Sequence, residues 1–265
     1  MPATVIILAR AGSKGVPGKN VTDLADRPCL EWTILDAQAA RTVGPIAVST
    51  DDPRATRIAG EFEGVRVIER PADLAGDLAT VDAAARHAHQ QLGSPEGPVV
   101  ILYANVPLRP AGLIDRAVRL LEERSADSVQ SYAPVGKHHP WWTARVNEAT
   151  GEVQPWEGDV LNHGVYRRQD LPQAFLPDGG VLVVSPAALH LQIELPEAER
   201  AGPHAFFGAS RLGVQTAEGE VIDIDTPIDV RVADAALRER EAQRAAEQLH
   251  ASGGRAGWRR AHRQS

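Results

Sequence analysis

The sequence predicts an α/β fold in which helices cover both faces of a mostly parallel sheet. Short apolar runs alternate with stretches of helical periodicity through the first half of the chain. The strand runs are rich in Val, Ile and Leu without polar alternation, which is typical of strands buried on both faces. Charged residues follow these runs directly, at the strand ends where α/β folds bind ligands.

Each expected element follows from this pattern in chain order. Strands are predicted at residues 4–8, 46–49, 65–69, 99–103 and 127–132, and helices at residues 30–41, 53–62, 80–92 and 111–123. The helices connect parallel strands by right-handed crossovers. Arg10, Asp51, Arg70 and Arg109 fall at or just past strand ends. We therefore expect the functional site at that edge of the sheet.

The βα rhythm stops in the middle of the chain. Residues 133–208 instead carry a His-His-Pro-Trp-Trp run beginning at His138 and the pair Phe206-Phe207, which predicts an inserted subdomain. Residues 1–132 and 209–241 then form the main domain. After Gln248 the chain has four arginines, a Gly-Gly pair and no acidic residue, so the basic segment 242–265 is predicted to be disordered.

Composition narrows the class of protein. A chain of 265 residues forms one or two domains with a substantial core, and Cys29 is its only cysteine, which excludes an intrachain disulfide. Its formal charge of −7 gives no reason to expect nucleic-acid binding. No apolar run approaches the roughly 20 residues of a membrane span, and no signal-like segment opens the chain, so we expect a cytoplasmic protein without a membrane partner.

The segment 10–20, RAGSKGVPGKN, is the strongest functional signal. It places three glycines and three cations directly after the first strand, which suits a loop that holds a polyphosphate. Five residues separate Gly12 from Gly18, and Asn20 follows Lys19, so the spacing and hydroxyl of a Walker A motif are missing. A helix does not begin directly after the glycines, which argues against a Rossmann dinucleotide site.

A pair of carboxylates near the other end supplies the second signal. Asp223 and Asp225 are two residues apart, so on an extended segment they project to the same side. Two like charges this close favour a bound cation, and oxygen ligands suit Mg²⁺. The alternative is that Asp225 caps the helix beginning at Thr226-Pro227.

Other polar residues carry weaker predictions. Asp52 precedes Pro53 at a helix start, so we interpret it as an N-cap. His138 and His139 lack further ligands for a zinc site, which favours a hydrogen-bonding or interface role. Arg109 follows the fourth strand, and the sequence supports substrate binding and a structural role equally.

The loop resembles the N-terminal signature of the acylneuraminate cytidylyltransferases, the CMP-sialic acid synthetases. That signature runs Arg-x-Gly-Ser-Lys-Gly-hydrophobic-Pro-x-Lys-Asn, and every fixed position is present. The resemblance continues to about Leu237. It runs through Ser49-Thr50-Asp51-Asp52, Arg70-Pro71 with Leu74-Ala75 and Asp77, Pro107-Leu108-Arg109, His138-His139-Pro140, Arg168-Gln169 and Asp223-Ile224-Asp225-Thr226-Pro227.

The resemblance implies a Rossmann-like fold of the nucleotide-diphospho-sugar transferase type, with a small inserted subdomain that makes a homodimer. It implies a nucleotidyltransferase that uses CTP and an acidic sugar, with Mg²⁺, to give a CMP-sugar and pyrophosphate. The catalytic residues are then Arg10, Lys19 and Asp225, and the metal ligands Asp223 and Asp225. The nucleotide-binding residues are Arg10, Ser13, Lys14, Lys19, Asn20, Arg70 and Thr80. The acceptor-binding residues are Tyr103, Asn105, Arg109, Arg168, Phe206 and Phe207.

Departures from the family pattern cluster on the acceptor side. Tyr103 stands where the family has Gln, Trp142 replaces a common Lys, and Asp178 and Leu182 replace Asn and Tyr. Such changes favour a different acceptor, so sialic acid, another nonulosonic acid, a 3-deoxy-sugar acid and a non-sugar acid stay open. Two other classes also remain: a sugar-nucleotide enzyme of the same fold that uses another nucleotide, and a non-catalytic nucleotide-binding module.

Overall fold

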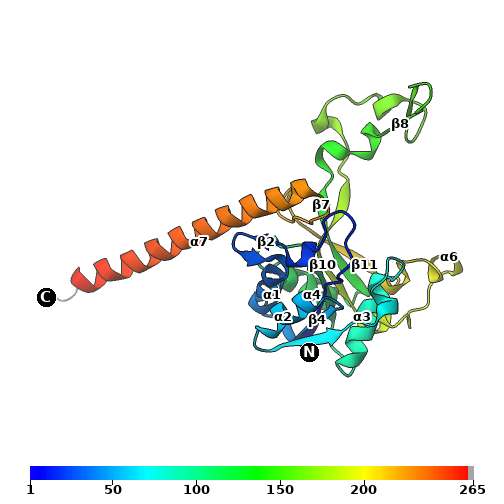
Figure 1. Ribbon diagram of the computed structural model, residues 1–265. Helices are drawn as coiled ribbons and strands as arrows, with labels where there is room; N and C mark the ends of the chain where they lie inside the picture. The colour runs from blue at the N-terminus through cyan, green and yellow to red at the C-terminus, as the bar shows by residue number, and fades with distance from the viewer. Residues whose placement is uncertain (262–265) are drawn as a thin grey trace.

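A seven-stranded sheet forms the centre of the computed structural model, which describes residues 1–261. Its strands lie in the order β11-β7-β10-β6-β1-β4-β5, and β10 alone among them runs antiparallel to its neighbours. The strands are β1 (Ala3–Leu8), β4 (Val43–Thr50), β5 (Val65–Glu69), β6 (Val99–Tyr103), β7 (Ser128–Pro134), β10 (Phe175–Val184) and β11 (Arg211–Gln215). The predicted mostly parallel sheet is confirmed (Figure 1).

Helices and short strands complete the chain. The helices are α1 (Cys29–Ala39), α2 (Pro53–Gly60), α3 (Val81–Gln91), α4 (Leu113–Arg124), α5 (Pro186–Leu189), α6 (Glu197–Arg200) and α7 (Pro227–Ala261). Two small hairpins pair β2 (Asp23–Leu24) with β3 (Arg27–Pro28), and β8 (Ala144–Val146) with β9 (Val153–Pro155).

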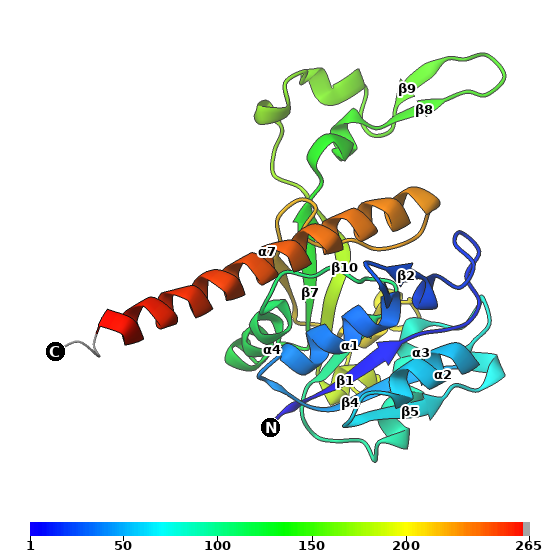
Figure 2. The same cartoon turned by 60° about the vertical axis from the view of Figure 1, so that its left-hand side comes forward.

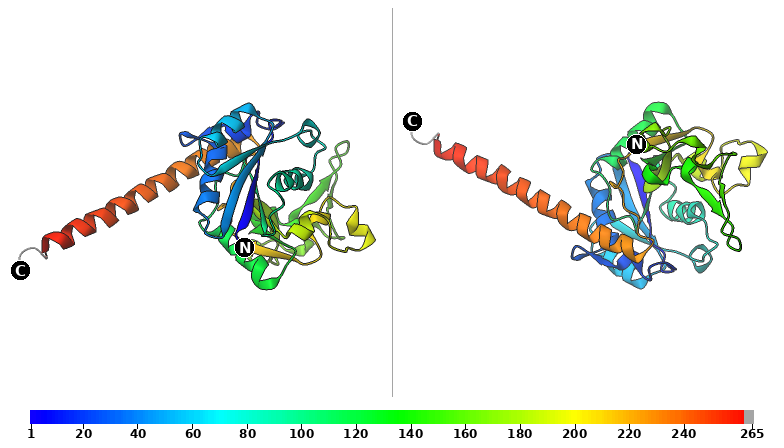
Figure 3. Two further views of the ribbon diagram at one scale, coloured as in Figure 1. Left: turned by 90° about the horizontal axis from the view of Figure 1, so that it is seen from below. Right: turned by 90° about the horizontal axis from the view of Figure 1, so that it is seen from above.

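The core has a layer on each face of the sheet. Along β1, Val5 and Ile7 join a cluster with α1, α2 and α4, whereas Ile6 and Leu8 join a second cluster with α3 and α5. This alternation explains why β1 is apolar throughout, since both faces of the strand are buried. Figure 3 shows the sheet between these two helical layers.

The part of the chain that leaves the main body is shorter than the predicted subdomain. Between β7 and β10 an arm carries the β8–β9 hairpin away from the sheet, as Figure 2 shows. β10 then pairs with both β6 and β7, and Leu189 and Phe206 pack in the core beside α3. The boundary expected at 208 is therefore wrong, because the apolar run Val181–Val184 is a central strand.

Helix α7 replaces the expected disordered tail. Its first turns pack Ala233 and Leu237 against Trp32, and the helix then continues away from the body to Ala261 (Figure 1). Where disorder is predicted from residue 242, the structure has helix as far as Ala261, and the Ala, Gln, Glu and Arg that make up most of residues 242–248 favour helix. Residues 262–265 lie outside the described residues. None of the described helices combines the length and apolar character needed to cross a membrane.

A buried histidine makes stability depend on pH. His89 on α3 lies with its ring nitrogens 3.0 Å from His190 Nε2 and from the Pro95 carbonyl oxygen. Burial lowers the pKa of His89 below its usual 6.5, and His190 lowers it further. The unfolded chain therefore binds this proton at a higher pH than the folded chain does.

We expect the free energy of unfolding to fall as the pH drops below 6.5, by at most about 1.4 kcal/mol per pH unit from this group. Urea unfolding at pH 7.5 and 5.5 measures the change. The free energy of unfolding of the variant His89→Gln should fall less between these two pH values than that of the wild type. The variant His138→Gln, changed at an exposed histidine, should show the same fall as the wild type. An equal fall in all three proteins would contradict this role of His89.

Candidate nucleotide-binding site

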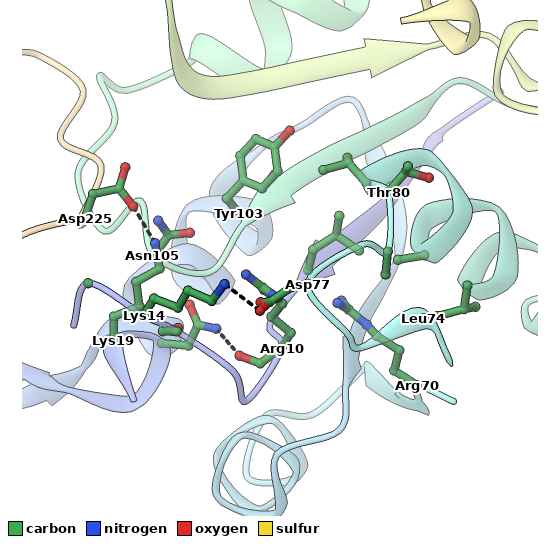
Figure 4. A pocket seen from close by; sticks show the side chains of 17 residues that line it. Arg10, Lys14, Lys19, Arg70, Leu74, Asp77, Thr80, Tyr103, Asn105 and Asp225 are labelled. Carbon is green, nitrogen blue, oxygen red and sulfur yellow. Dashed lines mark hydrogen bonds and ion pairs between the residues drawn. The ribbon is translucent and has the colours of Figure 1, made fainter. Parts of the chain in front are cut away.

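A pocket of about 420 Å³ opens at the carboxyl ends of β1, β5 and β6. The ends of parallel strands are where α/β folds bind ligands. Figure 4 shows the side chains that converge on it. It is lined by Leu8, Arg10, Ser13, Lys14, Gly15, Lys19, Asn20, Arg70, Leu74, Asp77, Ala79, Thr80, Val81, Ala84, Tyr103, Asn105 and Asp225. All seven predicted nucleotide-binding residues are in this set.

The glycine-rich loop adopts its shape through specific local contacts. Gly18 has φ 68°, a left-handed conformation that favours glycine, and it precedes a single turn of 3-10 helix at Lys19–Val21. The backbone N–H of Ala11 donates to the Asp51 carboxylate at 2.8 Å. Asp51 thus fixes the start of the loop.

The loop meets the C-terminal part of the chain through Lys19 and Asp225. Their Nζ and Oδ1 atoms lie 2.7 Å apart, although 206 residues separate them in sequence. Gly15 also approaches this segment so closely that a Cβ there would lie 2.2 Å from the Asp225 carbonyl oxygen. The cations at the start of the chain and the Asp225 carboxylate near its end therefore line one pocket, whereas Asp223 is not among the lining residues.

The two other cations of the loop share one carboxylate. Arg10 Nη1 lies 3.1 Å from Asp77 Oδ1, and Lys14 Nζ lies 2.7 Å from Asp77 Oδ2 (Figure 4). Sequence reasoning noted Asp77 within a motif and gave it no role. Asp77 lies 63 residues after Lys14 in the sequence, and no pattern in the sequence around it indicates that it contacts the loop.

The carboxylate pair projects as predicted. Ile224 is fully buried under α7, so its neighbours Asp223 and Asp225 point to the opposite side. Asn105 donates a hydrogen bond to Asp223 from its side-chain amide. Burial, and then the charge of Asp225, raises the pKa of Asp223 to about 6. A cation between these carboxylates would relieve both effects.

The capping alternative for Asp225 is not observed. Asp229 Oδ2 instead accepts hydrogen bonds from the backbone N–H groups of Asp225 and Thr226, at 3.1 and 2.7 Å. This is one half of a capping box, in which a side chain of the first helical turn, here Asp229, accepts from the backbone N–H of the residue before the helix, here Thr226. The side chain of Asp225 is therefore left to face Lys19 and the pocket.

The donor set fits a hard divalent ion that also binds the ligand. Within residues 1–261 no group of three His, Cys, Asp or Glu side chains gathers as metal ligands. Mg²⁺ is commonly held by one or two carboxylates together with substrate phosphates and water, and Asp225 at the pocket with its neighbour Asp223 fits such a site.

Two buried polar side chains, Asn20 and Arg70, also line the pocket. Asn20 donates from Nδ2 to the Arg10 carbonyl oxygen at 2.8 Å, and its buried Oδ1 has no hydrogen-bond partner among the described residues. Arg70 donates to Ser49 Oγ and to the Ser49 carbonyl oxygen at 3.1 and 2.8 Å. Burial lowers the pKa of Arg70 to about 10, so it stays charged at neutral pH. An unpartnered buried acceptor indicates a ligand that donates a hydrogen bond.

The remaining predicted residues of the pocket lie on its walls. Thr80 caps α3 by accepting from the Ala83 N–H, and Ser13 lies in the loop. Tyr103 is the last residue of β6, and Asn105, two residues further on, contacts Asp223. Burial and the charge of Asp223 raise the pKa of Tyr103, so it is a neutral phenol at neutral pH.

Four predicted acceptor residues do not reach this pocket within one chain. Arg109 is buried elsewhere and donates to the carbonyl oxygens of Gly180, Val106 and Tyr103, with Asp36 3.6 Å away. Its contacts support the structural interpretation and not acceptor binding. Arg168 pairs with Glu218 at the base of the arm. Phe206 and Phe207 pack with the core cluster behind α3.

Two weaker predictions hold. Asp52 caps α2 by accepting from the Arg54 N–H at 2.9 Å. His139 is buried and lies 3.1 Å both from the Pro172 carbonyl oxygen and, through Nδ1, from the N–H of Trp141, as expected of a hydrogen-bonding role.

The sheet and the pocket at the carboxyl ends of its strands together define an α/β protein with a candidate ligand site at the position usual for such folds. A family model described as Cytidylyltransferase matches residues 4–154, more than half of the chain. The chain belongs to the cytidylyltransferase family.

Curated relatives agree with this assignment. The chain is 30% identical over 252 residues to an N-acylneuraminate cytidylyltransferase of Streptococcus agalactiae serotype V, covering 91% of this chain and 56% of that protein. It thus spans little more than half the length of that relative. It is 35% identical over 118 residues to a 3-deoxy-manno-octulosonate cytidylyltransferase of Anaeromyxobacter dehalogenans, covering 44% of this chain and 46% of that one.

A solved structure supports the fold. A CMP:2-keto-3-deoxy-manno-octonic acid synthetase complexed with CTP superposes with a TM-score of 0.66 and 16% identity. The match covers 91% of this chain and all of that one. The predicted nucleotidyltransferase-type fold is therefore confirmed.

The contact between Gly15 and Asp225 can be tested in the ligand-free protein. The variant Gly15→Ala places a Cβ where the Asp225 carbonyl lies, so the loop must shift, and we expect a loss of about 1–3 kcal/mol in the free energy of unfolding. Gly12→Ala is the matched control, because a Cβ there meets nothing within 4 Å. Urea unfolding measures both. Equal stability of the two variants would show that the loop does not rest on this segment.

Proposed function

We propose that this protein is a cytidylyltransferase that activates an acidic sugar with CTP, giving a CMP-sugar and pyrophosphate. The observation that carries the proposal is the meeting of Lys19 and Asp225 at 2.7 Å in one pocket. This contact supports a site in which loop cations would bind phosphate beside a carboxylate that would hold a metal ion. Two relatives are named as cytidylyltransferases of N-acylneuraminate and of 3-deoxy-manno-octulosonate. These names support an acidic sugar as acceptor.

In the proposed reaction the anomeric hydroxyl oxygen of the acceptor attacks the α-phosphorus of CTP. The bond from the α-phosphorus to the bridging oxygen breaks, pyrophosphate leaves with that electron pair, and the hydroxyl proton passes to a base or to solvent. Such a reaction depends on alignment and on neutralised charge around the phosphorus. Arg10, Ser13 and Lys14 would hold the triphosphate, and Lys19 would lie near the α-phosphate. Asp225 completes this catalytic set.

Asp223 and Asp225 would hold Mg²⁺, which when bound neutralises phosphate charge and lowers the pKa of a coordinated hydroxyl. Asn105 orients Asp223 through its amide hydrogen bond. Lys19 Nζ lies 2.7 Å from Asp225 Oδ1, and this contact directs the carboxylate at the pocket.

The buried polar groups support cytosine as the base. The unpartnered Oδ1 of Asn20 is an acceptor, and the exocyclic amine of cytosine is a donor, whereas uracil presents an oxygen at that position. A buried acceptor left without a partner costs binding free energy, so UTP should bind less well than CTP. Arg70 supplies a charged donor to the same pocket.

The acceptor then lies beside Tyr103 and Asn105, between the carboxylates and the sheet.

Arg168, Phe206 and Phe207 do not line this pocket, so a role of Arg168 in binding the acceptor requires the arm of a second copy. We propose a homodimer formed through the arm. Apolar side chains exposed on it support this, among them Val146, Val153, Trp156, Val160 and Tyr166. A cytoplasmic location, where CTP is made, is part of the same proposal.

A pyrophosphate-release assay tests the function. The purified protein is given Mg²⁺, one of CTP, UTP, GTP or ATP, and a panel of 2-keto sugar acids and non-sugar acids. We expect turnover with CTP and at least one acidic sugar. Turnover with another nucleotide would indicate a different enzyme of this fold, and nucleotide binding without turnover of any acceptor would indicate a binding module.

In that assay the variant Lys19→Ala should reduce kcat/KM for CTP by at least about 100-fold, because it removes the cation expected at the α-phosphate. Arg57→Ala is the control, since Arg57 is an exposed cation on α2 paired with Glu61 outside the pocket. Activity retained in Lys19→Ala would remove Lys19 from the catalytic set.

A further inference from the structure

One carboxylate in the pocket is not explained by the proposed reaction. Asp77 lies in the strap, defined as residues 71–80, which connects β5 to α3. Both of its oxygens face loop cations, with Oδ1 3.1 Å from Arg10 Nη1 and Oδ2 2.7 Å from Lys14 Nζ. Unlike Asp223 and Asp225, it lies on the opposite side of the loop cations from the C-terminal segment, and Figure 4 shows it within the pocket.

The contacts of Asp77 are those of a phosphate group. An oxyanion bridged by one arginine and one lysine, each on a separate oxygen, is the arrangement in which such a pair binds a polyphosphate. Lys14 and then Arg10 lower the pKa of Asp77, so the group is an anion at neutral pH. A ligand phosphate and Asp77 therefore require the same two cations.

The strap is able to release these contacts. Its backbone hydrogen bonds are local, from Leu74 to Pro71, from Ala75 to Ala72 and from Ala79 to Gly76. Its polar contacts with the loop come from Asp77 and from the Gly76 carbonyl oxygen, which accepts from Arg10 at 3.4 Å. The Asp77 side chain is half exposed, and Leu78 beside it is almost fully exposed.

We propose that Asp77 is an affinity-determining residue that occupies a phosphate subsite, so that a polyphosphate binds only by displacing it from Arg10 and Lys14. This inference rests on the proposed function in taking the loop as the polyphosphate site. Asp77 lowers the affinity for the triphosphate and, by returning to Arg10 and Lys14, speeds the departure of pyrophosphate.

The size of the effect follows from the exposure of the two ion pairs. Exposed pairs are each worth little, so removing the charge of Asp77 should tighten polyphosphate binding by roughly 3- to 10-fold. The variant Asp77→Asn keeps the shape of the side chain and removes the negative charge. Asp73→Asn is the matched control, because Asp73 is an exposed carboxylate of the same strap that does not line the pocket.

The test measures binding of inorganic pyrophosphate and of CTP by calorimetry, and the dissociation rate of pyrophosphate by stopped flow. For Asp77→Asn we expect lower dissociation constants for both ligands and a slower dissociation rate. Asp73→Asn should match the wild type, and Asp77→Glu should retain the wild-type affinity. If Asp77 only shaped the loop, the variant Asp77→Asn would instead bind polyphosphate less tightly than the wild type.

The outcomes separate the two proposals. If the wild type binds CTP and pyrophosphate and Asp77→Asn binds them equally or more weakly, the role of Asp77 is overturned and the proposed function stands. If Asp73→Asn tightens binding as much as Asp77→Asn, the effect is one of net charge and the subsite assignment is overturned. If neither the wild type nor any of the variants binds CTP or pyrophosphate, the proposed function fails together with the inference.

Discussion

The site depends on one constraint: the loop that follows β1 must touch the segment that precedes α7. The Lys19–Asp225 ion pair and the close approach of Gly15 to the Asp225 backbone make this contact. Asp229 takes over the capping of α7, and Ile224 anchors the segment under that helix, so Asp225 is directed at the loop. The pocket is assembled in this way from the loop after β1 and the segment before α7.

Charge balance in the ligand-free pocket follows from the same arrangement. Each loop cation that lines it faces a carboxylate, Arg10 and Lys14 at Asp77 and Lys19 at Asp225. Clustered cations would otherwise repel one another and destabilise the folded loop. A nucleotide with its divalent ion can bring an equivalent set of charges, so the protein exchanges internal partners for ligand ones. The internal pairs give the loop its shape before a ligand arrives.

The sequence was sufficient to predict the elements that are governed by local pattern. Apolar runs buried on both faces revealed β1 and β6, and the glycine-cation loop revealed residues that line the pocket, because each signal lies within a short segment. The central strand β10 was missed, since Val181–Val184 follows irregular chain and pairs with strands distant in sequence. Arg109 illustrates the same limit. Its burial depends on carbonyl oxygens from three separate positions, which no local pattern encodes. The contacts of Asp77 with Arg10 and Lys14 could not be predicted either, because only the folded chain brings the strap against the loop.

A double-mutant cycle at Lys19 and Asp225 tests most directly whether the two ends of the chain act on one ligand. The affinity for CTP with Mg²⁺ is measured for Lys19→Met, Asp225→Asn and the double variant. Residues that share a ligand and touch each other are coupled, so we expect the double variant to differ from the sum of the single effects by about 0.5–3 kcal/mol. Additive losses would contradict the account, because they would place the loop cation and the carboxylate at independent sites.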